Sequence, residues 1–504
     1  MTLDESTLSR RGRTREELAG RSFDLLVIGG GILGSGVARE ASRNGLSVAL
    51  VDRADFGSAT TSSSSKLVHG GLRYLRLGDI RLVRESHAER RALMQVVAPH
   101  LVRRIPFLMP LYEQGPYRPA TIQAALWLYA TLARERPAGL LGPERAQRSV
   151  PSLRTDGLRC CGVYADAWTH DARLCLANVR GAAGLGATVL NYAEVTSLLM
   201  TSGRVTGADV RDVLDGEHIR VDARTVVNAC GPWVDRVRRL ADERALPSTA
   251  LSKGVHVLLP LEEGWSAALS VPHDSVRVSF AVPWLGMLLL GTTDDLYEGD
   301  PDLAEPTEDD IRRVLDEAGI ALDSSLLRRE RVLSSFAGLR VLPRGGRATA
   351  SARRETLLLP GPPGLLSVAG GKLTTYRRIA LDVLRALRAD LGLHRIDARP
   401  APLPGADDLR GATTRLARRF PELEPRVRAH LALLYGSLAE EVLADAERDP
   451  ELLRPLHPAA PDIAAQIVYA REREWACTSE DLLRRRTTLG LRGLSVPELE
   501  PLSR

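Results

Sequence analysis

The sequence predicts a mixed fold, with a parallel-sheet α/β part, an antiparallel sheet in the middle of the chain, and a helical C-terminal part. Residues 23–28, FDLLVI, form a continuous apolar run of the kind found in strands buried on both faces of a parallel sheet. Short apolar segments between residues 251 and 293 are separated by Pro and Gly without helical spacing, which indicates an antiparallel sheet. Beyond residue 409 the apolar spacing is helical, and a length of 504 residues suggests two or three domains.

The composition excludes several classes of protein. With 44% hydrophobic and 26% charged residues, the chain has the composition of a soluble globular protein. The net charge of +5 is small for this length and only 4% of the residues are aromatic, so nucleic-acid binding is not indicated. The five cysteines are odd in number and form no CxxC pair, which favours reduced cytosolic thiols over disulfides or a metal site.

Two segments bear on targeting and on membranes. Residues 1–20 lack the apolar segment of a secretory signal, and we expect them to form a flexible tail. No run reaches the roughly 18 apolar residues of a membrane-spanning helix. The nearest approach is residues 120–133, ATIQAALWLYATLA, flanked by Arg118, Arg134 and Arg136. A helix in the membrane interface and a buried core helix both explain this pattern.

A glycine-rich motif follows the first predicted strand. Gly29, Gly31 and Gly34 have the GxGxxG spacing, a predicted helix ends near residue 45, and a second strand ends at Asp52. The first glycine permits a tight turn, the second lets a pyrophosphate approach the backbone, and the third lets helix and strand pack closely. The helix N-terminus favours phosphates, and Asp52 can accept hydrogen bonds from ribose hydroxyls. The motif predicts a dinucleotide site in a Rossmann-like domain.

Lysine is rare in this chain. It occurs only as Lys66, Lys253 and Lys372, although the chain has 68 basic residues. Because arginine cannot replace a compact ammonium beside a ligand, each lysine marks a candidate site. Lys66 lies in SSSSKLVHGGLRYL, residues 62–75, and Lys372 lies in LLSVAGGKLTTYRR, residues 365–378. The second segment repeats the order of strand, glycines and helix seen in the first motif.

Six segments, taken in chain order, carry a family resemblance. They are DLLVIGGGILGSGVAREASRNGLSVALVD, TTSSSSKLVHGGLRYL, NACGPW, KGVHVLLP, GTTDD and SVAGGKLTTYR. They closely resemble the FAD-dependent (respiratory, aerobic-type) glycerol-3-phosphate dehydrogenases, from about residue 22 to the C-terminus. The resemblance implies a fold like that of D-amino acid oxidase, with a Rossmann-like FAD-binding domain, an antiparallel-sheet substrate domain and an all-helical C-terminal cap. It also implies that the cofactor is FAD.

The resemblance gives an expected division of the chain into domains. We expect a discontinuous FAD-binding domain at residues 21–100, 155–250 and 335–390, and a substrate-binding domain at residues 101–154 and 251–334. Residues 391–408, rich in Pro and polar residues, are the expected linker, and residues 409–504 the helical domain.

The implied activity is the oxidation of sn-glycerol 3-phosphate to dihydroxyacetone phosphate, with hydride transfer to flavin N5 and electrons passed to a quinone. A glycerol-3-phosphate oxidase that uses oxygen and releases hydrogen peroxide, and a non-catalytic FAD-binding protein, are the alternatives. Because quinones reside in the bilayer, we expect a cytoplasmic protein with peripheral contact to the cytoplasmic membrane, and residues 120–133 are the candidate contact. A homodimer is also compatible with the sequence.

Oxidation of an alcohol needs a proton acceptor and a clamp for the substrate. The resemblance implies catalytic roles for His69, His256 and Arg340, and either histidine could take the proton because imidazole titrates near neutral pH. The implied substrate-binding residues are Arg73, Tyr74, Arg340, Arg353 and Lys372. The implied cofactor-binding residues are Gly29, Gly31, Gly34, Asp52, Ser64, Ser65, Lys66, Val195, Gly231, Gly371, Lys372, Leu373 and Thr374. The residues that follow Arg340 and Arg353 depart from the usual family pattern.

Overall fold

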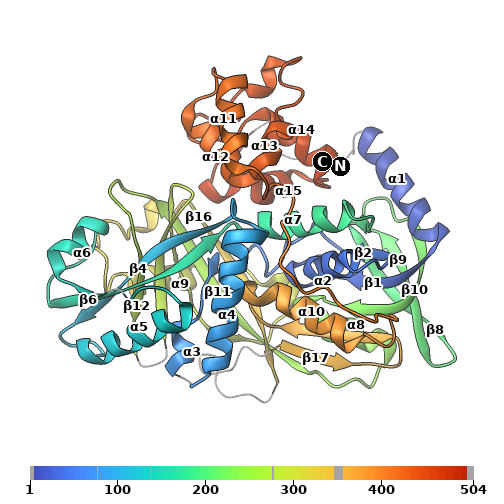
Figure 1. The fold of residues 1–504 in the computed structure, drawn as a ribbon, viewed down its shortest axis with the longest axis horizontal. Coiled ribbons are helices and arrows are strands. Elements are labelled where there is room, and N and C mark those ends of the chain that lie inside the picture. The colour runs from blue at the N-terminus through green and yellow to red at the C-terminus, as the bar shows by residue number, and fades with distance from the viewer. Residues whose placement is uncertain (1–4, 77, 138, 275–276, 345–355, 497–504) are drawn as a thin grey trace.

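The computed structural model describes residues 5–76, 78–137, 139–274, 277–344 and 356–496 (Figure 1). It contains two large sheets and a C-terminal helical domain that sits above them in this view. The predicted fold class is confirmed. The helices of the C-terminal domain are α11 (Leu409–Arg419), α12 (Pro425–Tyr435), α13 (Ala439–Val442), α14 (Ala464–Arg473) and α15 (Ser479–Asp481).

The first sheet is parallel at its centre. Its strands run in the order β17 (Thr356–Pro360), β18 (Leu365–Gly370), β10 (His218–Asn228), β1 (Ser22–Ile28), β2 (Val48–Val51) and β7 (Thr188–Leu190), and the antiparallel strands β8 (Ala193–Thr201) and β9 (Arg204–Asp212) extend from β10. Helices α2 (Ile32–Arg43), α7 (Asp171–Ala183) and α10 (Tyr376–Ala386) pack together, and their apolar side chains share one buried core with β1 and β2. The continuous apolar runs predicted as buried strands are therefore the centre of this sheet.

The second sheet is antiparallel apart from one parallel pair, β4 with β12. It contains β3 (Leu67–Val68), β4 (Val102–Tyr112), β5 (Leu140–Leu141), β6 (Leu158–Thr169), β11 (Thr249–Pro260), β12 (Ala268–Pro272), β13 (Val278–Trp284), β14 (Met287–Gly291), β15 (Asp295–Tyr297) and β16 (Ser334–Pro343). The helices on this half of the molecule are α3 (Leu72–Arg76), α4 (Ile80–Ala92), α5 (Pro119–Ala133), α6 (Pro143–Ser149) and α9 (Glu308–Ala318).

The sheets correct two of the expected domain boundaries. Strand β6 pairs with β4 along its whole length, and β16 pairs with β11 over ten residues, so both belong to the second sheet. From the sequence, residues 155–169 and 335–343 are expected in the FAD-binding domain. Each segment contains a strand, and a strand sequence alone does not show which sheet it joins.

The N-terminal residues also differ from expectation. Residues 5–20 form helix α1 (Glu5–Gly20), which packs against β7 and β10, and are not a flexible tail. Arg11 is buried and donates to Asp212 at 2.8 Å and to the carbonyl of Asn191 at 3.0 Å. Because these partners lie about 200 positions away, the N-terminal sequence gives no sign of the anchor.

A buried ionic network joins the C-terminal domain to the first sheet. Asp55, close after β2, binds both Arg485 and Arg486, and Arg486 makes a two-pronged contact with it at 2.8 Å. On the other side, Arg173 of α7 binds Glu474 through two bonds of 2.6 and 2.7 Å. Burial alone would raise the pKa of Asp55, but the two arginines outweigh burial and hold that pKa below its usual value.

Candidate functional site

A cavity of about 1130 Å³ lies where the carboxyl ends of the parallel strands meet the second sheet. Its walls come from the turn after β1, the end of β2, the loop after β10 and the loop after β18, together with β11 and β16. In parallel α/β sheets, ligands bind at the carboxyl ends of the strands. The volume exceeds the range of about 300–1,000 Å³ that holds a drug-sized ligand, so the cavity suits a larger one.

The glycine turn has the geometry that a dinucleotide requires. Gly29 has a φ of +100°, and a Cβ at Gly34 would lie 1.8 Å from the carbonyl oxygen of Gly29. The first α2 residue, Ile32, donates its amide to Thr61 Oγ1 at 3.0 Å. Gly31 lines the cavity just ahead of this helix, whose N-terminus is a favourable place for phosphate.

Asp52 stands at the end of β2 with its carboxylate already oriented. One oxygen accepts from the amide of Gly30 at 2.6 Å and the other from the amide of Ala54 at 2.9 Å. Burial raises the pKa of Asp52 to about 6. Val195 also lines the cavity.

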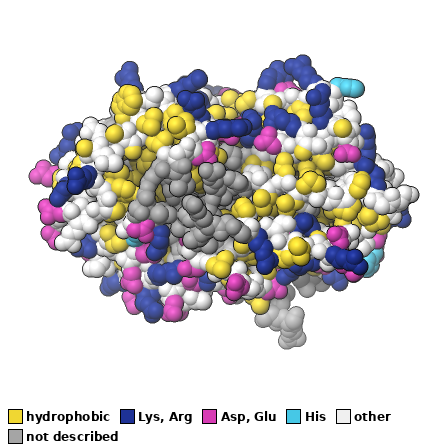
Figure 2. Space-filling model, turned by 90° about the horizontal axis from the view of Figure 1, so that it is seen from below, with side chains coloured by type: hydrophobic (Ala, Val, Ile, Leu, Met, Phe, Trp, Pro, Cys, Tyr) yellow, Lys and Arg dark blue, Asp and Glu magenta, His cyan; other side chains and the backbone are white. Residues whose placement is uncertain are grey.

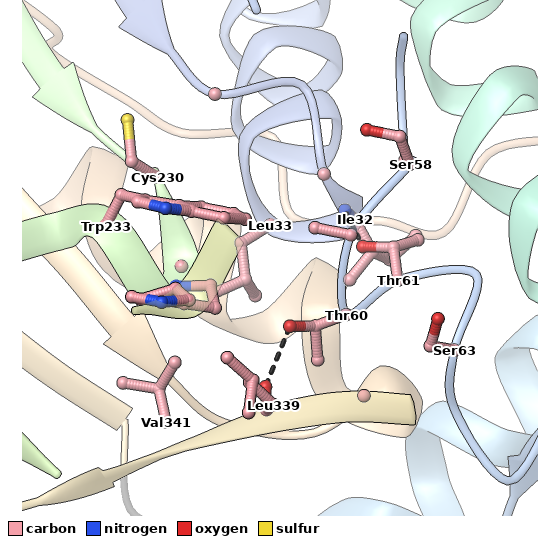
Figure 3. A pocket seen from close by; sticks show the side chains of 18 of the residues that line it. Ile32, Leu33, Ser58, Thr60, Thr61, Ser63, Cys230, Trp233, Leu339 and Val341 are labelled. Atoms are coloured by element: carbon pink, nitrogen blue, oxygen red, sulfur yellow. Dashed lines mark hydrogen bonds between the residues drawn. The ribbon is translucent and has the colours of Figure 1, made fainter. Parts of the chain in front are cut away.

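The serine run is an ordered loop. The hydroxyl of Thr60 donates to the carbonyl of Leu339 at 2.7 Å, which ties the loop to β16 (Figure 3). Ser64 Oγ donates to Asp171 at 2.7 Å, and Ser65 Oγ lies 2.9 Å from His256 Nε2. Ser64 and Ser65 therefore reach the cavity wall from a loop that the second sheet and α7 hold in place.

Lys66 and Lys253 lie elsewhere. The ammonium of Lys66 is buried, at 2.8 Å from Asp171 and 2.9 Å from the carbonyl of Ser62, and the residue is outside the cavity wall. Lys66 therefore shapes the loop from behind, and the structure gives it no contact surface for a cofactor. Lys253 pairs with Asp310 of α9 at 2.7 Å and is also outside that wall. Of the three lysines, Lys372 alone lines the cavity.

Strands β11 and β16 present His256 and Arg340 on one face. Ser252 pairs with Arg340, Gly254 with Gly338, and His256 with Phe336, and side chains at alternate positions share a face. The two residues between them are glycines, and their lack of side chains leaves room for the Arg340 guanidinium and for the serine loop. A Cβ at Gly254 would lie 2.4 Å from the Arg340 guanidinium, and one at Gly338 would lie 2.4 Å from the Ser63 carbonyl.

Arg340 is held by polar groups on one side. Its guanidinium donates to Thr292 Oγ1 at 2.9 Å, to the carbonyl of Thr293 at 3.2 Å and to Asp294 at 3.2 Å. These contacts orient the planar guanidinium, and the residue lines the cavity. Such an arginine is suited to binding a phosphate or a developing oxyanion.

His256 is held in its neutral form. Burial lowers its pKa well below the usual value, and the nearby charges of Arg340 and Lys66 lower it further. Its ring stacks on Phe336 with centroids 5.1 Å apart. Nδ1 is buried and has no hydrogen-bond partner within the part of the chain that the structure describes.

The segments of His69 and Lys372 meet at the same end of the cavity. The amide of His69 donates to Thr374 Oγ1 at 3.0 Å. The ammonium of Lys372 lies 3.4 Å from the centre of the Tyr74 ring, which holds it by a cation–π contact. Tyr74 is buried behind Lys372 and lies outside the cavity wall.

The cavity thus gathers most of the residues implied by the resemblance. Those in its wall are Gly29, Gly31, Asp52, Ser64, Ser65, His69, Val195, Gly231, His256, Arg340, Gly371, Lys372, Leu373 and Thr374. Gly34 lies behind the turn, as its packing role requires. Arg353 and the side chain of Arg73 lie outside the described residues.

Sequence reasoning missed a group of residues at another end of the cavity. The guanidinium of Arg53 lies over the Trp233 ring, 4.2 Å from its centre, and Arg53 also pairs with Asp302. Arg236 pairs with Asp302 at 2.9 Å. Figure 3 shows Trp233 facing the cavity beside Cys230. Trp233 belongs to the NACGPW segment, which carries part of the family resemblance and could have indicated it. Asp302 lies in the short 3₁₀ turn Pro301–Leu303, which has no recognisable motif.

Comparisons with known proteins agree with this geometry. The model of the FAD-dependent oxidoreductase family matches residues 24–377, and that of the C-terminal domain of alpha-glycerophosphate oxidase matches residues 397–495. Glycerol-3-phosphate dehydrogenase 2 of Mycobacterium tuberculosis is 36% identical, over 96% of this chain and 84% of its own length. The glycerol-3-phosphate dehydrogenase of Synechocystis is 34% identical, over 95% and 91% respectively. This chain belongs to the FAD-dependent glycerol-3-phosphate dehydrogenase family.

Structural comparison extends the family assignment to the cofactor. The X-ray structure of the Bacillus halodurans glycerol-3-phosphate dehydrogenase, complexed with FAD, matches with a TM-score of 0.77 and 30% identity, over 95% of this chain and 88% of that chain. The cofactor of this oxidoreductase is FAD. The cavity fits it, because Gly231 has a φ of +51° and a Cβ there would meet nothing within 4 Å, so the backbone is open to a ligand.

We expect FAD binding to depend on pH through Asp52. We propose that the Asp52 carboxylate accepts hydrogen bonds from the ribose hydroxyls, so that binding requires the proton to leave a group whose pKa burial raises to about 6. The affinity of the apoprotein for FAD should therefore fall as pH drops through 6, by about tenfold between pH 7 and pH 5. Quenching of flavin fluorescence measures it. The Asp52→Asn variant should lose this dependence, and a wild-type affinity that is constant from pH 7 to 5 would refute it.

Proposed function

We propose that this protein oxidises sn-glycerol 3-phosphate to dihydroxyacetone phosphate, with hydride transfer to flavin N5 and electrons passed on to a quinone. The observation that carries the proposal is one continuous cavity, in which a dinucleotide site opens directly onto two cations and two histidines. Bound FAD supplies the hydride acceptor. The relatives named as glycerol-3-phosphate dehydrogenases support the choice of substrate.

The phosphate of the substrate requires cations at a fixed position. Lys372 offers a point charge held over Tyr74, and Arg340 offers a planar fork held by Thr292 and Asp294. Arg73 and Arg353 remain proposed partners on the basis of their motifs. Anchored cations bind a dianion without first having to lose side-chain freedom, which favours affinity.

His256 and His69 both line the cavity in which we place the substrate. The neutral imidazole of His256 is the form that can accept a proton, but burial and the charges of Arg340 and Lys66 lower its pKa and so weaken it as a base. Beside it, Arg340 stabilises negative charge that develops on the alcohol oxygen. His69 lines the same cavity, on the segment that contacts Thr374. We propose that one of these two histidines removes the hydroxyl proton and that the other orients the substrate.

Substrate preference tests the proposed clamp. With a dye as electron acceptor, we expect kcat/KM for sn-glycerol 3-phosphate to exceed that for glycerol at least about 100-fold, because charge-assisted hydrogen bonds contribute roughly 1.5–3 kcal/mol each. The enantiomer, sn-glycerol 1-phosphate, is the control for the position of the hydroxyl group. Equal rates with glycerol and its phosphate would contradict the clamp.

Helix α5 is the proposed membrane contact. Ile122, Leu126 and Tyr129 of this helix are buried, while Trp127 and Leu128 are 58% and 38% exposed and offer an apolar surface for the proposed contact. Figure 2 views the side where Figure 1 places α3 and α5, and hydrophobic side chains gather there between basic ones. Among the described residues, no helix has the length and apolarity to cross a bilayer. Interfacial contact by an aromatic residue beside flanking arginines suits a protein that delivers electrons to a quinone.

We expect a Trp127→Ser, Leu128→Ser double variant to bind vesicles of phosphatidylglycerol and phosphatidylcholine several-fold more weakly than the wild type, because it removes the exposed apolar area. Co-sedimentation measures the bound fraction. Leu246→Ser removes an equally apolar and more exposed side chain, which lies after α8 (Val234–Ala241), and should leave binding unchanged. Equal binding by the double variant and the wild type would rule out α5 as the contact.

A further inference from the structure

The segment that carries His69 rests on a buried cluster of three polar side chains, Asp166, Arg90 and Tyr129. Asp166 Oδ1 accepts from the amide of Gly70 at 3.0 Å and from the Arg90 guanidinium at 2.5 Å. Asp166 Oδ2 accepts from the Tyr129 hydroxyl at 2.8 Å. The three residues come from β6, α4 and α5, and all of them lie outside the cavity wall.

Asp166 continues a strand pairing by means of its side chain. Strand β3 is only two residues long, and its Leu67 and Val68 pair with Trp168 and Ala167 of β6. Asp166 is the next residue of β6 beyond these pairs. Its carboxylate accepts a hydrogen bond from the amide of Gly70, just beyond the last backbone pair of the two strands. The position of the His69 backbone, between Val68 and Gly70, is therefore set from both sides.

Gly70 has no room to shift toward the protein interior. A Cβ at Gly70 would lie 2.2 Å from the His87 ring, which packs edge-on against Tyr129 with centroids 4.5 Å apart. Burial, together with the charges of Arg90 and Arg91, lowers the pKa of His87 to about 3, so the ring is neutral and acts as a packing surface. The segment is thus seated on His87 and bound by Asp166.

The carboxylate of Asp166 is stabilised within the cluster. Burial raises its pKa, and Arg90 opposes that effect. Arg90 also donates to the carbonyl of Ala165 at 2.6 Å and pairs with Glu135. A buried charge that is bound by several hydrogen bonds holds its neighbours in one geometry, because a displacement weakens its contact with its partner.

Helix α4 holds the opposite segment through the residue next to Arg90. Glu89 makes two bonds to Arg377, of 2.8 and 3.1 Å. Arg377 follows shortly after Lys372 and Thr374, and Thr374 contacts the amide of His69. Two consecutive residues of one helix thus brace the two segments that carry His69 and Lys372.

We infer that Asp166, Arg90 and Tyr129 are positioning residues that set His69 and Gly70 against Lys372 and Thr374, and thereby set the affinity for substrate. They act through the backbone of residues 68–71 and touch neither substrate nor FAD. The effect on substrate affinity rests on the proposed function, whereas the effect on the segment itself does not.

The Tyr129→Phe variant tests this role, because it removes one hydroxyl and keeps the buried ring. We expect amide hydrogen exchange in residues 67–72 of the holoenzyme to rise about fivefold or more, because the hold on the Gly70 amide loosens. We also expect KM for sn-glycerol 3-phosphate to rise at least threefold, with the FAD content unchanged. Tyr164→Phe is the matched control, since Tyr164 is a buried neighbour that packs against Tyr129 at 5.8 Å.

These measurements distinguish a failure of the positioning role from a failure of the proposed substrate. If Tyr129→Phe and Tyr164→Phe give the same exchange in residues 67–72, the positioning role is refuted. If exchange rises but the wild-type enzyme does not oxidise sn-glycerol 3-phosphate, the proposed substrate fails and the positioning role stands. A second pair of variants separates this role from a change in packing. Asp166→Asn keeps an oxygen that can accept from the Gly70 amide, whereas Asp166→Ala does not. Amide exchange in residues 67–72 should therefore stay closer to the wild type in Asp166→Asn than in Asp166→Ala. Wild-type exchange in Asp166→Ala would also refute the role.

Discussion

Replacing Arg340 with leucine should lower kcat/KM for sn-glycerol 3-phosphate by about 10²–10³, the usual loss when an oriented donor to a developing charge is removed. The guanidinium is already oriented by Thr292, Thr293 and Asp294, so the enzyme binds the substrate without reorganising it. Steady-state kinetics separates the two roles that the motif implies. A fall in kcat assigns Arg340 to the alcohol oxygen, and a rise in KM alone assigns it to the phosphate.

The control for Arg340→Leu is Arg344→Leu, just beyond the end of the same strand. Arg344 is exposed and lies outside the cavity wall, so its loss should change kcat/KM less than twofold. Arg340→Lys keeps the charge without the planar fork and should fall between the leucine variant and the wild type. All variants should retain FAD with the wild-type visible spectrum. If Arg340→Leu matches the wild type, Arg340 has neither role.

Replacing Arg486 with methionine should lower the free energy of unfolding by about 3 kcal/mol, because it leaves Asp55 buried with one of its two cations removed. Arg486 is fully buried and binds both oxygens of Asp55 as well as the carbonyl of Glu474. As Asp55 lies three residues beyond Asp52, we also expect the holoenzyme to release FAD more readily on mild heating. Denaturant unfolding and released flavin fluorescence measure the two effects.

Arg473→Met is the matched control for Arg486→Met. Arg473 belongs to the same domain and directly precedes Glu474, but its side chain is exposed. We expect the free energy of unfolding of the Arg473→Met variant to stay within about 0.5 kcal/mol of the wild type, as for surface substitutions in general. A similar loss in both variants would show that the buried ion pair contributes nothing specific.

The parts of the fold that the sequence predicts are those that depend on neighbours in the chain. The turn of Gly29, Gly31 and Gly34 and the acid at Asp52 lie within one βαβ unit, so their spacing specifies their geometry. The antiparallel sheet is also predictable, because its short strands follow one another. Which strands belong to this sheet cannot be predicted in the same way, because β6 and β16 join it through partner strands elsewhere in the chain.

The candidate site shows the same limit. Lys66 and Lys372 have equal standing in the sequence, yet Asp171, 105 positions away, removes Lys66 from the cavity. Asp166 has no motif around it, and its importance becomes visible only when β3 is seen to end beside it. Helix α1 is a further case, since its anchor Asp212 is 201 positions from Arg11. In each case the contact depends on a partner far away in the chain, which a single sequence does not reveal.

Anaerobic mixing of the yellow holoenzyme with sn-glycerol 3-phosphate tests the central claim most directly. We expect the visible flavin absorbance to bleach with formation of one dihydroxyacetone phosphate per flavin, and to return rapidly when a soluble quinone analogue is added but slowly in oxygen. Rapid recovery in oxygen with release of hydrogen peroxide would identify an oxidase instead. A flavin that stays oxidised in the presence of excess sn-glycerol 3-phosphate would contradict the proposed function.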